Sequence, residues 1–283
     1  MHRTAYIVAY STPRLQEKGI SLATIEFQGI VNVRDLGGIP VAGERIVAPG
    51  LFYRGGSLAK ATEQDLELLF GELGVSCVVD VRCGWELESK PDIIPDGIEY
   101  LHIPFYDLEK VGIEYTEPTA GTKMVGNDLA CEPGHFYRSL ANPLTVRQMR
   151  ACLDAVFDRA CAGRSVYQHC SGGKDRAGIF AALILLALGA DRDAIVADYT
   201  ETNISRDKRF DQMMERFLRF TDGDEQHARL LVESHRALPQ NLDTFFGEVA
   251  VRYGSVDAFM SDQLGLTDER KSMVRARCTE SLG

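Results

Sequence analysis

The middle of the chain contains Ser165-Val166-Tyr167-Gln168-His169-Cys170-Ser171-Gly172-Gly173-Lys174-Asp175-Arg176-Ala177-Gly178, which continues as an apolar run to Ala190. Residues 165–168 are short and partly β-branched, which predicts a buried strand, and residues 177–190 predict a buried helix. A glycine-rich loop joins the two. Glycines let such a loop curl so that its N–H groups point inward, and the following helix adds its positive N-terminal end. The stretch therefore predicts an anion site between a strand and a helix.

The same loop carries a cysteine and, six positions later, an arginine. The dipoles at the start of the loop stabilise the thiolate of Cys170, and a thiolate is a strong nucleophile. The planar guanidinium of Arg176 can hold two phosphate oxygens at once. We predict that Cys170 attacks phosphorus and that Arg176 neutralises the developing charge. The rest of the loop is expected to surround the phosphate: Ser171, Gly172, Gly173, Lys174, Ala177 and Gly178.

Cleavage of a phosphate ester also needs an acid that protonates the leaving oxygen. Asp175 is the preferred candidate, although it could instead only position Arg176 or the loop. Asp107 follows a predicted strand end and is the competing acid. Lys174 could contact a second phosphate or lie at the rim of the pocket. His169 is expected to support the loop through hydrogen bonds.

The remaining chain predicts strands that alternate with helices. Strands are expected at residues 75–81 and 98–105, and helices at residues 62–73, with a cap at Thr62, and 145–162. Such alternation implies parallel βαβ units in a sheet covered by helices, with the ligand beyond the carboxyl ends of the strands. The expected fold class is α/β, with a central, mostly parallel sheet.

Composition excludes several other classes of protein. The 283 residues fit a single domain over residues 1–283. A net charge of −10 argues against a nucleic-acid partner. The seven cysteines lack zinc-ligand spacing, so no metal is expected, and unpaired thiols suggest the cytoplasm. No apolar run is long enough for stable membrane insertion. Secretion without a cleaved signal stays open, and the oligomeric state is not addressed by the sequence.

Two segments differ from the core pattern. Residues 109–142 are rich in Gly, Pro and polar residues, which is typical of a mobile flap beside a site. Residues 204–236 are charged and amphipathic, and they predict one helix on each side of Thr221-Asp222-Gly223-Asp224. This second segment is either a helical lid over the pocket or a solvated outer layer.

The loop resembles that of the atypical bacterial protein tyrosine phosphatases of the mycobacterial tyrosine phosphatase B type. The resemblance covers about residues 22–279, with the least support between 109 and 142. It rests on further motifs: Asn32-Val33-Arg34-Asp35-Leu36-Gly37-Gly38, Phe52–Leu58, Asp80-Val81-Arg82 with Glu86, Ala197–Asn203, Tyr253-Gly254-Ser255 and Leu264-Gly265-Leu266.

The resemblance implies a phosphotyrosine-phosphatase-like fold, with a helical lid in some members, that works without metal or cofactor. It implies the roles of nucleophile for Cys170, phosphate ligand for Arg176 and general acid for Asp175. One position departs from the family, which usually has Thr or Ser where this chain has Ala177. That hydroxyl helps the sulfur to leave, so its absence predicts slower hydrolysis of the phosphocysteine.

The outer motifs have simpler interpretations as structural support. Arg34 and Asp35 precede paired glycines and are expected to form a salt-bridged turn. Asp80, Arg82 and Glu86 are expected to form a buried charge network that supports the loop.

Three functional hypotheses follow from these residues. The first is a cysteine-dependent phosphomonoesterase that acts on phosphorylated proteins, with phosphotyrosine as the main substrate and dual specificity open. The second is a phosphatase of phosphoinositides or inositol phosphates, with a preference set by Lys174. The third is a phosphate-binding pseudophosphatase that recognises phosphorylated partners without turnover, which Ala177 keeps open.

Overall fold

The computed structural model describes residues 7–10, 22–105, 134–205 and 207–282 of the chain. Asp107 and residues 109–133 of the expected flap lie outside the described residues. Within residues 134–142, the structure has the short helix α4 (His135–Ser139).

The protein is built around a seven-stranded sheet in the order β1-β2-β3-β6-β9-β7-β8. Strands β6, β9, β7 and β8 are parallel, and β1, β2 and β3 extend the sheet from β6 in antiparallel pairs. The strands span Ile7–Tyr10 (β1), Leu22–Ile25 (β2), Arg34–Asp35 (β3), Phe52–Gly55 (β6), Val75–Asp80 (β7), Glu99–His102 (β8) and Ser165–His169 (β9). The α/β class is thereby confirmed, and the parallel half carries the loop. The other half is antiparallel.

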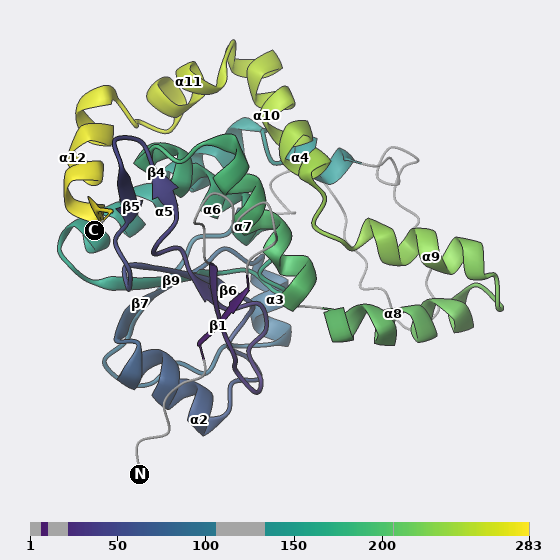
Figure 1. Ribbon diagram of the computed structural model, residues 1–283. Helices are drawn as coiled ribbons and strands as arrows, with labels where there is room; N and C mark the ends of the chain where they lie inside the picture. The colour runs from purple at the N-terminus through teal and green to yellow at the C-terminus, as the bar shows by residue number, and fades with distance from the viewer. Residues whose placement is uncertain (1–6, 11–21, 106–133, 206, 283) are drawn as a thin grey trace.

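Helices cover the sheet on both faces (Figure 1). The longer ones are α5 (Pro143–Cys161), α6 (Asp175–Leu188), α7 (Arg192–Ser205), α8 (Asp207–Phe220), α9 (Glu225–Ser234), α10 (Pro239–Tyr253) and α12 (Asp268–Cys278). The shorter ones are α2 (Glu63–Leu66), η1 (Glu67–Glu72), α3 (Gly84–Ser89), α11 (Val256–Ala258) and η3 (Phe259–Gln263). A small second sheet joins β10 (Thr279–Ser281), β5 (Arg45–Val47) and β4 (Pro40–Val41) in that order.

The side chains of the central strands point alternately to the two faces of the sheet, which divides the core into two clusters. Val166 and Val79 pack with α5 and α6 on one face, whereas the neighbouring Tyr167 and Val78 pack with the α2–η1 segment on the other. Side chains of a strand point alternately to opposite faces, so each central strand contributes to both clusters. Helix α6 is buried almost throughout, which is why its sequence is apolar all round.

Local signals predicted several elements well. Thr62 caps α2, with its Oγ accepting from Asp65 N at 3.1 Å and the Asp65 carboxylate accepting from Thr62 N at 3.0 Å. The motifs at 253–255 and 264–266 lie where the C-terminal helices α10 and η3 end. Gly254 and Gly265 have φ values of 85° and 68°, which take the chain out of the helical conformation.

Helices α8 and α9 form a hairpin that extends from the rest of the protein beyond α7 (Figure 1). They are the two helices expected on either side of residues 221–224. At the base of the hairpin, Asn203 Nδ2 donates to Ala237 O at 2.9 Å, and Ala237 N donates to Asn203 Oδ1 at 2.8 Å. Among the described residues, no helix has the length and apolar character needed to cross a membrane.

Candidate active site

The loop between β9 and α6 lies at the carboxyl end of the central parallel strand. Its neighbours are β6 and β7, and Cys170 directly follows β9 with 3% of its surface exposed. The first hydrogen bond of α6 runs from Gly178 N to Lys174 O at 2.9 Å. The N–H groups of Asp175, Arg176 and Ala177 precede that bond, so they are the donors that a helix N-terminus offers to an anion.

Gly173 fixes the shape of the loop. Its φ is 68°, and a Cβ at this position would lie 2.5 Å from the carbonyl carbon of Gly55. Both the left-handed conformation and the close approach to β6 therefore require glycine.

Arg176 is held by Glu86 at the start of α3. Its Nη2 donates to Glu86 Oε1 at 2.8 Å and its Nη1 to Glu86 Oε2, while Cys83 N also donates to Oε2 at 2.9 Å. Burial acts to raise the pKa of Glu86, but the hydrogen bonds and charge of Arg176 lower it to about 2. Ser171 Oγ donates to the same carboxylate. Glu86 thus orients both the arginine and the loop.

Cys170 lies close enough to this guanidinium to interact with its charge. Burial alone would lower the pKa of Arg176, whereas the hydrogen bonds with Glu86 and the negative charges of Cys170 and Glu86 raise it above its ordinary value. Cys83 Sγ is 3.8 Å from Arg176 Nη1. The arrangement can hold a dianionic phosphate next to a nucleophilic sulfur.

A second charge cluster holds the carbonyls of the loop from behind. Asp198 on α7 accepts from Arg34 Nε at 2.7 Å and from Arg54 Nη1. Arg54 Nη2 donates to Gly173 O at 2.8 Å, and Asn32 Nδ2 donates to the same oxygen at 2.9 Å. Because the carbonyls are bound on this side, the N–H groups of the loop are left to face the opposite side, where phosphate would lie.

A third cluster supports the residue before the nucleophile. Arg82 donates to Asp80 and, through Nη2, to Asp92 Oδ2 at 2.7 Å. His169 Nε2 is 3.1 Å from the same Asp92 oxygen, and His169 Nδ1 lies 3.2 Å from Cys170 O. Burial acts to lower the pKa of His169, but the charges of Asp80 and Asp92 raise it.

This third cluster also brings together three groups of the kind that bind metal ions. Asp80, Asp92 and His169 each place one ligand atom within 4.8 Å of the others. Arg82 already pairs with both carboxylates, so the cluster has its cation and is best explained as structural support.

Arg34 and Asp35, expected to form one salt-bridged turn, bind different partners. Asp35 accepts from Gly37 N at 2.8 Å and from Gly50 N at 2.7 Å, away from the loop. Burial raises the pKa of Asp35 to about 6, against the effect of these two hydrogen bonds. The sequence suggested a turn at these residues, but they form strand β3. Successive side chains of a strand point to opposite faces of the sheet, so Arg34 and Asp35 meet different partners.

Lys174 and Asp175 both have partners near the end of the loop. Lys174 Nζ donates to His235 O at 3.0 Å and lies 3.2 Å from Asp175 Oδ1. Lys174 therefore ties the loop to the base of the α8–α9 hairpin. The hydroxyl of Tyr137 on α4 donates to Asp175 Oδ1.

The last two loop positions are packed into the core. Ala177 is fully buried, and its carbonyl accepts from Gln168 Nε2 at 3.0 Å. A Cβ on Gly178 would lie 2.6 Å from the ring of Tyr199. The N–H of Gly178 already belongs to the helix, so this residue allows close packing instead of binding phosphate through its backbone.

Several supporting residues were missed from the sequence. Asn32, Arg54 and Asp198 lie within the motifs that carry the family resemblance, which was the available signal for them. Asp92 had no signal, and Tyr137 belongs to the segment interpreted as a flap.

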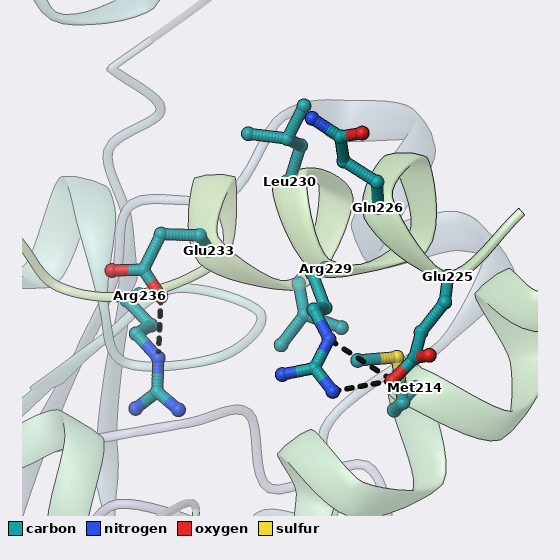
Figure 2. A pocket seen from close by; sticks show the side chains of 8 residues that line it. Met214, Glu225, Gln226, Arg229, Leu230, Glu233 and Arg236 are labelled. Carbon is teal, nitrogen blue, oxygen red and sulfur yellow. Dashed lines mark hydrogen bonds and ion pairs between the residues drawn. The ribbon is translucent and has the colours of Figure 1, made fainter.

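The α8–α9 hairpin carries a pocket of about 630 Å³ (Figure 2). Its lining residues are Met214, Glu225, Gln226, Arg229, Leu230, Val232, Glu233 and Arg236. The charged side chains pair among themselves, Arg229 with Glu225 and Arg236 with Glu233. None of these residues belongs to the loop, so this pocket is not the candidate active site.

Comparisons with known proteins identify the family of the chain. The profile described as "Tyrosine phosphatase family" matches residues 25–280. The triple specificity protein phosphatase PtpB of Mycobacterium tuberculosis is 33% identical over 200 residues, which are 65% of this chain and 71% of that protein. A Cupriavidus necator protein named provisionally as a tyrosine-protein phosphatase is 29% identical over 240 residues, 85% of this chain and 84% of its own length. Among solved structures, the core catalytic domain of the PP-IP phosphatase SIW14 from S. cerevisiae aligns at 13% identity with a TM-score of 0.35, over 70% of this chain and 98% of that one.

The fold and these matches define a phosphoric monoester hydrolase of the protein-tyrosine-phosphatase class. Because the profile covers most of the chain, the protein belongs to the tyrosine phosphatase family. The resemblance drawn from the loop is thus confirmed.

Proposed function

We propose that the protein hydrolyses phosphate monoesters through a phosphocysteine at Cys170. The thiolate attacks phosphorus, Arg176 neutralises the equatorial oxygens, and the N-terminal N–H groups of α6 hold the phosphate. The observation that carries this proposal is the Glu86 carboxylate, which binds both guanidinium nitrogens and fixes Arg176 against the loop. A buried arginine with such an anchor is preorganised for an anion.

Asp175 is the acid in this proposal. It lies at the first turn of α6, and 34% of its side chain is exposed, so it can reach a leaving oxygen in the pocket mouth. Asp107, which lies outside the described residues, stays the competing candidate.

We propose that the substrates are phosphorylated proteins and that phosphotyrosine is the preferred phosphorylated residue. A wider range, including phosphoserine, phosphothreonine and phosphoinositides, is the alternative, and one relative is named as a triple specificity protein phosphatase. The α8–α9 hairpin would act as a lid, since Lys174 connects its base to the loop. A flap would be confined to residues 109–133, because Tyr137, Leu140 and Ala141 belong to the core, and the whole chain would act as a single domain. No nucleic-acid partner or membrane insertion is proposed. A cytoplasmic setting would keep the thiol of Cys170 reduced and reactive.

The test is the release of phosphate from a phosphotyrosyl peptide, the matching phosphoseryl peptide and a soluble short-chain phosphoinositide, each in the presence of EDTA. The proposal expects the highest kcat/KM on the phosphotyrosyl peptide. Higher kcat/KM on the lipid headgroup would make the phosphoinositide alternative correct. Tight binding of the phosphopeptides with no release of phosphate would favour the pseudophosphatase.

A further inference from the structure

A chain of hydrogen bonds from three other helices ends on Asp175. Asn241 Nδ2 on α10 donates to the hydroxyl of Tyr199 on α7 at 3.1 Å, and this hydroxyl is 2.8 Å from that of Tyr137 on α4. The Tyr137 hydroxyl then donates to Asp175 Oδ1. Four separate elements are thus joined at the first residue of α6.

The chemistry of the groups fixes the direction of the chain. A carboxylate oxygen can only accept here, so the single hydroxyl proton of Tyr137 is used on Asp175. The bond between the two hydroxyls must therefore be donated by Tyr199, whose own oxygen accepts from the amide of Asn241. Each member donates toward Asp175, and donors aligned in this way strengthen one another.

Burial protects this chain of hydrogen bonds from water. Tyr137 has 7% of its surface exposed and Tyr199 is fully buried. Burial and the charge of Asp175 raise the pKa of Tyr137, so its hydroxyl stays protonated and remains a donor. The ring of Tyr199 is itself held against Gly178, where only a glycine leaves it room.

Both described partners of Asp175 are on the same carboxyl oxygen. Tyr137 donates to Oδ1, and Lys174 Nζ is 3.2 Å from Oδ1 as well. When this carboxyl group takes up a proton, the proton goes to Oδ2, because Oδ1 already accepts two donors. The rotation of the group is fixed by the same contacts.

We propose that Tyr137 is a positioning residue that orients Asp175 so that Oδ2 delivers the proton to the leaving oxygen. This inference rests on the proposed function. In the first step the bond between Cys170 Sγ and phosphorus forms, the phosphorus–oxygen ester bond breaks, and the proton on Asp175 Oδ2 passes to the departing oxygen. In the second step water attacks phosphorus, its proton passes to Oδ2, and the sulfur leaves as a thiolate. Oδ1 accepts from Tyr137 throughout.

The test compares leaving groups in the variant Y137F. Phenyl phosphate has a basic leaving oxygen that needs a proton, whereas p-nitrophenyl phosphate has a leaving group that departs as an anion. The kcat/KM value reports the first step alone, so slow hydrolysis of the phosphocysteine does not affect it. We expect Y137F to lose about tenfold or more on phenyl phosphate, out of the 10²- to 10⁴-fold that a general acid contributes, and no more than about threefold on p-nitrophenyl phosphate.

Two further variants make the comparison specific. Y253F also removes a phenolic hydroxyl, which in this case donates to the backbone carbonyl Ala141 O at 2.9 Å. Tyr253 lies away from the loop, so Y253F should leave kcat/KM unchanged on both substrates. D175N should show the same leaving-group dependence as Y137F, and the double variant should lose little more than D175N alone, because both changes act through one proton. If Y137F does not fold, Y199F takes its place in the test. Y199F removes the hydroxyl that donates to Tyr137, and it should show the same dependence on the leaving group to a smaller degree.

Equal losses on both substrates, or no loss on phenyl phosphate, would overturn the role of Tyr137 while leaving the cysteine mechanism intact. A wild-type protein that cleaves neither substrate would overturn the proposed function and this inference with it.

Discussion

Replacing Glu86 with Gln tests the anchor of Arg176. The carboxylate uses both oxygens, since Oε1 accepts from Arg176 Nη2 and from Ser171 Oγ, and Oε2 accepts from Arg176 Nη1 and from Cys83 N. Gln keeps the shape and one accepting oxygen, but it replaces the other with an amide that cannot accept. Arg176 would then be a buried cation with half of its pairing lost.

The magnitude follows from the pKa of Glu86. Its lowering from 4.5 to about 2 corresponds to about 3 kcal/mol of stability at neutral pH, at about 1.36 kcal/mol for each pH unit. The side chain is only 12% exposed, so solvent screens this interaction little. Because the folded-state pKa lies below the unfolded value, the contribution is complete above about pH 4.5 and is lost as the pH falls through about 2.

The assay is urea unfolding of wild type and E86Q at pH 7 and pH 3, followed by circular dichroism. We expect E86Q to be less stable by about 2–3 kcal/mol at pH 7 and by about half of that at pH 3. The matched control is E248Q, which breaks a partly exposed i,i+4 pair with Arg252 on α10, whose guanidinium side chain is 46% exposed, and should cost less than about 0.5 kcal/mol. A loss in E86Q as small as that in E248Q, or a loss equal at both pH values, would refute the coupling between Glu86 and Arg176.

Two further changes address the start of α6. G178A would place a Cβ 2.6 Å from the ring of Tyr199 and should lower the free energy of unfolding by about 1–3 kcal/mol. The control G247A has open space around its Cβ and should raise the free energy of unfolding by about 0.5–1 kcal/mol. Similar urea midpoints for the two variants would contradict the packing of Gly178 against Tyr199. A177S would restore the hydroxyl that the family usually has at this position, and it should speed the hydrolysis of the phosphocysteine by up to about tenfold, with a smaller pre-steady-state burst of p-nitrophenol. An unchanged burst would show that the missing hydroxyl does not limit turnover.

The sequence predicted the parts of the protein that depend on local signals. The strand, loop and helix of residues 165–190 form one continuous stretch, so their order alone placed Cys170 at the end of a central strand. The cap at Thr62 is local in the same way. The predictions failed where a structure depends on distant contacts or on the register of strands.

The clusters behind the loop illustrate this limit. Asp198 pairs with Arg34 and Arg54 because β3 and β6 are antiparallel neighbours, with Arg34 opposite Arg54. Periodicity along α7 predicts which positions are buried, but it does not show which strand residues they meet. The contact between Tyr137 and Asp175 depends on the packing of four helices. The composition of residues 109–142, on which the flap was predicted, therefore could not reveal it.

The proposed mechanism depends on the transfer of phosphate to Cys170. The most direct measurement is the mass of the protein quenched in acid within the first turnover of p-nitrophenyl phosphate, in the presence of EDTA, for wild type, C170S and C83S. One added phosphoryl group is expected on a peptide that contains Cys170 in wild type and in C83S, and neither the group nor nitrophenol release is expected in C170S. Phosphate release by C170S, or a phosphoryl group on any other residue, would contradict it.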